Sequence, residues 1–182
     1  SLNPDLVLAH ELGKDLSFDA FEQMIDAGIN VYFVKDALNI EETYETIEEI
    51  GKVTGAVEAA EQLITEMKVS FNEVIDVVSK IPEDERKTVF FELTGEPEIY
   101  TAGTNTFFNE ILELVNAKNA AAEIDGWAQI DPEAIIDLNP DVIITLYGNY
   151  SDDPVSEVLN RDGFSDVSAV KNKQVFDVND DL

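Results

Sequence analysis

The chain has 182 residues, 45% of them hydrophobic, and its 39 acidic residues against 11 basic residues give a net charge of -28. This length and apolar content suit one large domain or two small lobes with a real core. The excess negative charge repels phosphate backbones, and no Lys/Arg cluster offers counterion release. The composition therefore argues against nucleic-acid binding and against binding to anionic membrane surfaces.

Cysteine is absent, which excludes disulfides, thiolate metal sites and cysteine nucleophiles but leaves the cellular compartment open. No run of about 18 apolar residues occurs and no signal peptide opens the chain, so we expect no membrane span. The first residues, Ser1 to Pro4, resemble the middle of a domain. We therefore expect targeting information, if there is any, to lie upstream.

The first third of the chain alternates between strand and helix patterns. The apolar run at Leu6–Ala9 follows a turn-forming Asn-Pro-Asp and predicts a buried strand. Helical spacing of apolar residues predicts a helix over Phe18–Ala27, with Gly28 as its stop. A second strand is expected at Val31–Val34. This order is typical of an α/β domain.

Two helices are predicted next. Asn39 and Glu42 have the spacing of a capping box, which opens a helix that ends before Gly55. An apolar stripe with helical periodicity then continues from Ala56 to about Ile81, and it predicts a helix of roughly 35 to 40 Å. The proline and charged residues at 82–86 end this helix and mark a boundary.

The alternation restarts after this boundary. Asp131 is the expected N-cap of a helix that has Pro132 at its first position and ends at Asn139. The other expected elements are a strand at 88–91, a Gly/Thr-rich loop at 101–106, a helix at 107–115, a strand at 142–146 and a last strand at 174–178.

A short repeat relates the two halves of the chain. Leu-Asn-Pro-Asp followed by three apolar residues occurs at 2–8 and again at 138–144. Asn-Pro-Asp before a strand is also common turn chemistry. Because the copies flank the long predicted helix, we favour two related α/β lobes joined by that helix, with a ligand in the cleft between them.

Several strings resemble a known family in the right order. They are the first nine residues, IEEIGKVTG at 47–55, Tyr100–Thr104 followed by FNEIL at 108–112, WAQIDPE at 127–133, LNPDVII at 138–144 and AVKNKQVF at 169–176. The chain resembles the helical-backbone (class III) solute-binding proteins of ABC importers for iron-siderophores, haem and cobalamin. The resemblance covers nearly the whole chain.

The resemblance implies an α/β fold with two Rossmann-like lobes bridged by one long helix. The implied division is a partial N-terminal lobe at 1–55, the bridging helix at 56–81 and a C-terminal lobe at 82–182. Such proteins capture a metal chelate and deliver it to the permease, in the periplasm or as lipoproteins outside the membrane. Family members have more sequence before Ser1 and a helix after Leu182, so we expect this chain to be truncated.

Aromatic and hydroxyl side chains follow the predicted strands of the second half, where open α/β sheets place their ligands. We expect ligand contacts from Tyr100, Thr101, Tyr147 and Tyr150. Trp127 lies in a polar stretch before a helix, and it is either an anchor in the lobe core or a flat platform for a ligand. The resemblance favours the platform.

We predict functional roles for two further residues. His10 is the only histidine, and it is either a ligand to haem or a chelated metal or a hydrogen-bonding surface residue. Glu133 is an acid favourable to the first turn of a helix. The resemblance also aligns Glu133 with a glutamate that docks onto an arginine of the permease. The equivalent glutamate of the N-lobe would lie before Ser1.

Few basic residues are available near the predicted ligand loops. Lys14, Lys35 and Arg161 are the candidates. A strongly anionic ferric catecholate needs several cations around it. A hydroxamate siderophore, cobalamin or haem therefore fits better as the ligand.

Two other classes of function compete with this interpretation. An α/β enzyme fragment is one, but no serine elbow, phosphate-binding glycine loop or metal-spaced His/Asp cluster appears, so we expect neither catalytic residues nor a protein metal site. An acidic protein-interaction module built on the long helix is the other. It predicts a polar cleft and no effect of a small ligand.

Overall fold

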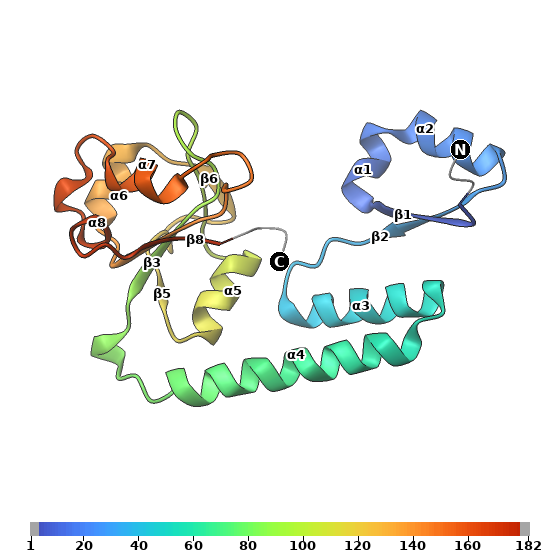
Figure 1. The fold of residues 1–182 in the computed structure, drawn as a ribbon, viewed down its shortest axis with the longest axis horizontal. Helices are drawn as coiled ribbons and strands as arrows, with labels where there is room; N and C mark the ends of the chain where they lie inside the picture. Colours follow the sequence, from blue (N-terminus) through green and yellow to red (C-terminus); the bar gives the residue numbers. More distant parts are fainter. Residues whose placement is uncertain (1–3, 179–182) are drawn as a thin grey trace. The chain divides into compact units, whose positions relative to one another are not determined.

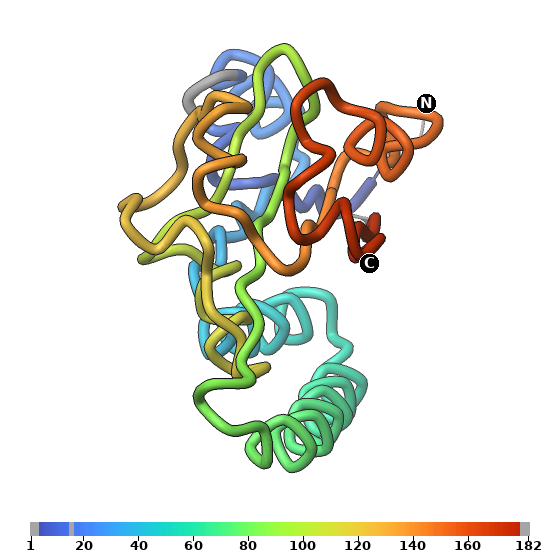
Figure 2. Tube along the Cα trace, turned by 90° about the vertical axis from the view of Figure 1, so that its left-hand side faces the viewer, coloured from blue at the N-terminus to red at the C-terminus, as the bar shows by residue number. Residues whose placement is uncertain are grey.

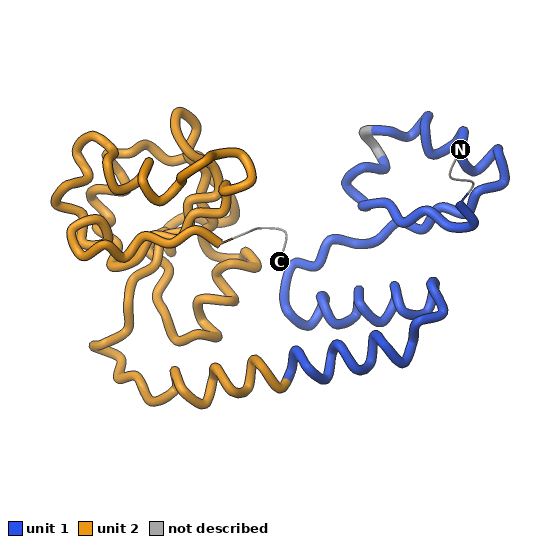
Figure 3. Tube along the Cα trace, viewed as in Figure 1, with its two compact units in different colours: residues 1–68 blue, residues 69–182 orange. Residues whose placement is uncertain are grey.

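The computed structural model describes residues 4–178, and these residues form two compact units (Figures 1 and 3). Unit 1 comprises residues 1–68 and unit 2 comprises residues 69–182. The division falls inside the longest helix, α4 (Val57–Val78). Both units contain parallel strands with helical connections, so the predicted α/β class is confirmed. The lobe limits at residues 55 and 82 stay a prediction.

Unit 1 begins with two parallel strands, β1 (Leu6–His10) and β2 (Asn30–Val34). Parallel neighbours need a crossover connection. Here it consists of α1 (Glu11–Leu16), which the sequence did not predict, and α2 (Phe18–Asp26), which it did. Phe21 of α2 packs edge-on against Phe33 of β2, with ring centroids 5.1 Å apart. This contact fixes α2 on the sheet.

The prediction that the first strand is buried is wrong. Leu8 is 42% exposed, and no residue of β1 or β2 is fully buried. The sheet of unit 1 has two strands among the described residues, which leaves its faces partly open. An apolar run predicts a strand from local preferences, but burial depends on how many elements cover it.

Helix α3 (Ile40–Thr54) has the caps that the sequence predicts. The side chain of Asn39 accepts a hydrogen bond from the Glu42 amide at 2.8 Å, and the Glu42 carboxylate accepts one from the Leu38 amide at 2.8 Å. Gly55 ends the helix with φ 75°, a conformation that glycine adopts without steric cost. The Asn39 cap and the glycine stop are confirmed, but the Glu42 carboxylate binds the amide of Leu38, one residue before the N-cap, rather than that of Asn39.

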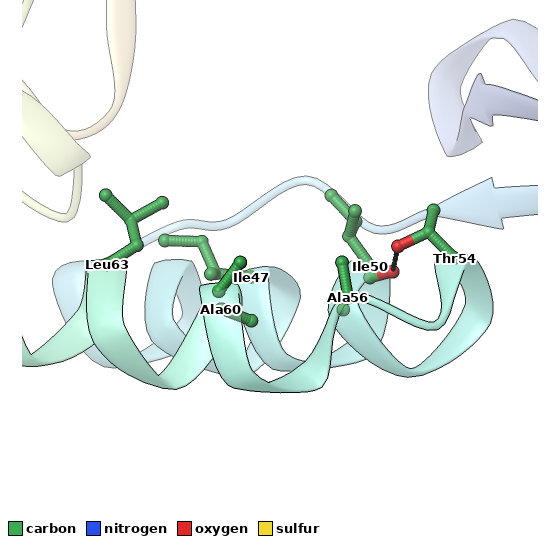
Figure 4. A pocket seen from close by; sticks show the side chains of 8 residues that line it. Ile47, Ile50, Thr54, Ala56, Ala60 and Leu63 are labelled. Atoms are coloured by element: carbon green, nitrogen blue, oxygen red, sulfur yellow. Dashed lines mark hydrogen bonds between the residues drawn. The ribbon is translucent and has the colours of Figure 1, made fainter.

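Helices α3 and α4 run side by side (Figures 1 and 2). They approach closely at Gly51, where an added Cβ would lie 2.6 Å from the Ala60 Cβ. Next to this contact is an open groove of about 270 Å³, with side chains from both helices along it (Figure 4). Its lining is almost wholly apolar and includes Ile47, Ile50 and Leu63. The groove therefore lacks the polar groups that orient a small ligand.

We expect Gly51→Ala to lower the free energy of unfolding by about 1–3 kcal/mol, since the new methyl group collides with Ala60. The double variant Gly51→Ala/Ala60→Gly removes the collision and should recover part of the loss, less about 1 kcal/mol for glycine inside a helix. Urea unfolding followed by circular dichroism measures both. Equal stability of the two variants would show that the helices separate freely at this point.

The apolar stripe predicted along the long helix is mostly not buried. Among the stripe residues, Ala60 and Ile64 are buried, whereas Leu63, Val74 and Ile75 are exposed. The helix ends at Val78 rather than near Ile81, and a short 3-10 helix at 83–85 follows the proline. Periodicity predicted the helix correctly but does not determine which of its apolar residues are covered.

Unit 2 is built on a parallel sheet in the order β5 (Lys118–Asn119), β3 (Thr88–Glu92), β7 (Val142–Thr145) and β8 (Val175–Asp177). Successive side chains point to opposite faces of a strand. Phe90 and Ile143 therefore enter one buried cluster, while Val89 and Phe91 enter another. The sheet is covered on both faces, as in a doubly wound α/β fold.

The helices of unit 2 divide between these faces (Figure 1). Leu112 of α5 (Phe107–Leu114) packs in the cluster with Val89 and Phe91. Residues of four further helices pack in the other cluster; these helices are α6 (Pro132–Leu138), α7 (Pro154–Leu159), the 3-10 helix at 164–166 and α8 (Ser168–Lys171). The strands and helices predicted at 88–91, 107–115, 132–139, 142–146 and 174–178 are all present, and each end agrees to within one residue.

Unit 2 also contains an antiparallel pair of strands that was not predicted. β4 (Tyr100–Ala102) pairs with β6 (Trp127–Gln129), so Thr101 and Ala102 lie in a strand rather than in the predicted loop. The loop is limited to 103–106, where the Thr106 side chain caps α5 by accepting a hydrogen bond from the Asn109 amide. Both strands are short, and each pairs with a segment that is distant in the sequence. Local sequence patterns do not reveal such pairing.

The sequence repeat leads into a parallel strand in both copies. β1 starts at Leu6 and β7 starts at Val142, which are equivalent positions of the repeat. In the second copy, Asp141 accepts a hydrogen bond from the Thr88 amide at 3.0 Å, which ties β7 to β3. Leu2 and Asn3 of the first copy lie outside the described residues.

Candidate functional site

The carboxyl ends of β3 and β7 form the part of unit 2 where an open α/β sheet places its ligands. The two strands are neighbours, with Glu92 opposite Thr145. The chain continues from these ends into the loop at 93–99 and the turn at 146–153. Side chains of both connections, together with α7, make up the candidate site.

A buried ion pair lies directly beneath this edge. Arg161 donates to both carboxylate oxygens of Glu92, from Nη1 at 2.8 Å and from Nη2 at 2.6 Å. The Tyr147 hydroxyl donates to Glu92 Oε1 at 2.8 Å. The Glu92 side chain is 0% exposed and that of Arg161 is 3% exposed. A bidentate pair with a third hydrogen bond compensates much of the desolvation that burial imposes on both charges.

These contacts fix the protonation of two members of the group. Burial and the negative charge of Glu92 raise the pKa of the Tyr147 hydroxyl far above its ordinary range. Burial lowers the pKa of the Arg161 guanidinium, but hydrogen bonding and attraction to Glu92 outweigh it, so the pKa is raised. Tyr147 therefore remains a hydrogen-bond donor and Arg161 remains a cation at neutral pH.

Arg161, the basic residue expected near the ligand loops of the second half, does lie there, but its guanidinium is already bound to Glu92. Glu92 is not among the site residues predicted from the sequence. A signal for it was present: an acidic residue directly ends the apolar run Val89–Phe91. Acids are almost never fully buried unless paired, so a charge in such a position predicts a buried partner.

Two adjoining hollows open above the ion pair. The tyrosine hollow has a volume of about 280 Å³ and is lined by Thr94, Gly95, Glu96, Tyr147, Tyr150, Ser151 and Glu157. The acidic hollow has a volume of about 500 Å³ and is lined by Glu96, Glu157, Asn160, Arg161 and Asp162. Glu96 and Glu157 belong to both. The predicted site residues Tyr147 and Tyr150 thus meet in one hollow, where Tyr147 is buried and Tyr150 is 88% exposed.

Trp127 and Tyr100 come together on the β4–β6 pair. Tyr100 and Ala102 are two residues apart on β4, and Trp127 lies opposite Ala102, so Tyr100 and Trp127 share one face. Trp127 is 57% exposed and stacks edge-on on Phe108, with centroids 5.7 Å apart. Thr101 is fully buried, and its hydroxyl has no hydrogen-bond partner among the described residues.

The last two predicted residues lie elsewhere. His10 ends β1 in unit 1, where its Nδ1 is 2.5 Å from Oδ1 of Asp36. Glu133 is exposed in the first turn of α6. Asp131 is the N-cap residue of that helix as predicted, but its side chain makes no capping hydrogen bond.

Between residues 4 and 178, no group of three or more His, Cys, Asp or Glu side chains is arranged to hold a metal ion. No helix within these residues is long and apolar enough to cross a membrane.

Comparison with known proteins identifies the family. The model of the periplasmic binding protein family matches residues 1–182. The chain belongs to the periplasmic binding protein family. Among solved structures, a possible iron-binding (periplasmic solute-binding) protein from Staphylococcus epidermidis has a TM-score of 0.82 and 38% identity, covering 98% of this chain and 68% of that one. This likeness confirms the α/β fold of a solute-binding protein.

Two curated relatives of this periplasmic binding protein are informative. The uncharacterized ABC transporter substrate-binding lipoprotein YvrC of Bacillus subtilis is 46% identical over 182 residues, which is the whole of this chain and 57% of that protein. A cobalamin-binding protein of Halobacterium salinarum is 31% identical over 149 residues, or 79% of this chain and 38% of that protein. The chain therefore spans little more than half the length of the first relative.

Proposed function

We propose that this periplasmic binding protein captures a metal chelate outside the cytoplasmic membrane and delivers it to the permease of an ABC importer. The observation that carries the proposal is the family match over the whole chain. The relatives support it, since one is named an ABC transporter substrate-binding lipoprotein and another a cobalamin-binding protein. A ferric siderophore, haem or cobalamin is the chelate, held without a covalent bond.

Within unit 2, the proposal assigns direct ligand contact to Trp127, Tyr100 and Tyr150. All three are exposed aromatic side chains, which give a large contact area at a low entropic cost. Trp127 is supported from below, because Phe108 stacks between it and Phe91. Thr101 and Tyr147 are buried and would shape the site from beneath. His10 is proposed as a ligand of the metal or chelate from unit 1.

We expect Trp127→Ala to weaken binding of the cognate chelate by about tenfold or more, as for an aromatic hot spot, while the free energy of unfolding changes little because the ring is mostly exposed. Isothermal titration and thermal shift against haem, cobalamin and ferric siderophores measure both quantities. Trp127→Phe is the matched control and should keep most of the affinity. If no chelate in the panel raises the unfolding midpoint of the wild-type protein, the proposed function fails.

The variant Glu133→Ala separates capture of the chelate from its delivery to the permease. Glu133 is exposed in the first turn of α6 and lines neither hollow. We propose that it docks onto an arginine of the permease. The variant should bind the chelate as the wild-type protein does but support less transporter-coupled uptake. Unchanged uptake would remove the docking role and leave chelate capture intact.

A further inference from the structure

The two hollows at the carboxyl ends of β3 and β7 have an unusual charge balance. Glu96 and Glu157 line both hollows, and Asp162 lines the acidic hollow. Arg161 is the one basic side chain among the described residues that line them. Its charge is neutralised by Glu92, which binds it through both carboxylate oxygens. Glu96 also lies within ion-pair range of Arg161, with Oε2 3.7 Å from Nε, so one guanidinium serves two carboxylates. Glu157 and Asp162 add further negative charge, and the lining of the hollows therefore keeps an excess of carboxylates over cations.

The other basic residues of unit 2 do not offset this excess. Arg86 and Lys87 precede β3, Lys118 begins β5 and Lys173 precedes β8. Because the four strands are parallel, these four residues lie at the amino edge of the sheet, opposite the hollows. The other two, Lys80 and Lys171, line neither hollow. Lys118 is in addition paired with Glu83, 3.4 Å away. Apart from Arg161, no basic residue in the described part of unit 2 lines either hollow, whereas the lining includes the carboxylates of Glu96, Glu157 and Asp162.

A second observation points to a bound polar group. Nε of Arg161 belongs to a buried side chain that lines the acidic hollow, and it has no hydrogen-bond acceptor among the described residues. Oε2 of Glu96 is 3.7 Å from this nitrogen, too far for a hydrogen bond. Buried donors are almost always paired in native structures. A neutral acceptor of the ligand, such as an amide carbonyl oxygen, would accept a hydrogen bond from Nε once the Glu96 side chain turns toward the ligand.

We infer that the tyrosine and acidic hollows select the chelate by charge, accepting a neutral or cationic face that carries amide or ammonium groups and rejecting carboxylate or catecholate anions. Amide N–H and ammonium groups donate to Glu96 and Glu157, whereas an anion placed there meets like charge in a partly desolvated hollow. This inference rests on the proposed capture of a metal chelate. It adds which face of the chelate unit 2 recognises.

The test compares three ferric chelates that share the metal and differ in net charge: ferrioxamine B as the cation, ferrichrome as the neutral complex and ferric enterobactin as the anion. Affinities are measured by quenching of Trp127 fluorescence at low and high salt. The wild-type protein should bind the cationic and neutral complexes more tightly than the anionic one. Salt should weaken binding of the cation and strengthen binding of the anion, because it screens both interactions.

The decisive variant is Glu96→Gln/Glu157→Gln, which removes two charges and preserves shape. Affinity for ferrioxamine B should fall about tenfold and affinity for ferric enterobactin should rise, with ferrichrome changed by less than about threefold. Asp137→Asn/Asp166→Asn is the matched control, since both acids are exposed and line neither hollow. It should leave all three affinities as they are.

The outcomes separate this inference from the proposed function. If the anionic chelate binds most tightly to the wild-type protein, or if the Gln variant keeps the wild-type preference, charge selection by the hollows is wrong while chelate capture stands. An equal change in the control variant would also overturn it, because net charge alone would then explain the preference. If no chelate of any charge binds, capture itself fails.

Discussion

Replacement of Arg161 by methionine is expected to lower the free energy of unfolding by about 3–5 kcal/mol, since it leaves the Glu92 carboxylate buried without a countercharge. The loss includes both hydrogen bonds to Glu92 and the contact of the guanidinium with the Phe164 ring, 4.8 Å from its centroid. Urea unfolding followed by the fluorescence of Trp127, the only tryptophan, reports on the unit that contains the pair.

Two comparisons show whether the effect comes from the unpaired charge. Arg161→Met/Glu92→Gln removes both charges and should be clearly more stable than the single variant. Lys171→Met removes a charge from an exposed position and should change stability by less than about 0.5 kcal/mol. If the single and double variants unfold at the same urea concentration, the buried ion pair does not control the stability of this unit.

Replacement of Gly103 by alanine is expected to cost about 3 kcal/mol, at the upper end for overpacking, because the collision involves backbone. The added Cβ would lie 2.0 Å from the carbonyl oxygen of Ile124 and 2.6 Å from its carbonyl carbon. The Gly103 amide donates to the Gly126 carbonyl at 2.8 Å, and Trp127 follows directly in the chain. Separation of these segments would move Trp127, so chelate affinity should fall together with stability.

Gly13→Ala is the control for this variant. No heavy atom lies within 4 Å of the Cβ position at Gly13, and alanine is favoured over glycine in a helix by about 1 kcal/mol. It should be neutral or stabilising. A Gly103→Ala protein with the unfolding midpoint and chelate affinity of the wild-type protein would show that the segments at 103 and 124 do not touch as described.

Most of the elements could be predicted because their signals are local. The Asn39 cap and the Gly55 stop each depend on the residues next to them in the sequence, and both are found where they were predicted. The pair β4–β6 was missed for the opposite reason. Its strands have three residues each, too few for a periodic pattern, and each is stabilised by pairing with the other rather than by its own sequence.

The candidate site was predicted in its position along the chain but not in the roles of its members. Tyr147 and Tyr150 follow β7 as expected, yet one is buried against Glu92 and the other is almost fully exposed. Arg161, expected as a basic residue near the ligand loops, is the partner of an acid that lies on another element. A side chain's charge is read from the sequence, but its availability depends on what lies within a few ångströms.

The sequence by itself determined the α/β class, the positions of the longer helices and of the central strands, the family resemblance and the strong negative charge. These properties depend on periodicity and turn chemistry, which involve residues close together in the sequence, and on composition, which does not depend on the fold. Only the tertiary structure decided that Glu92 and Arg161 neutralise each other, and that Glu96 and Glu157 line the hollows at the carboxyl edge of the sheet. These features arise from contacts between distant segments, and parallel pairing of the strands is what brings them together.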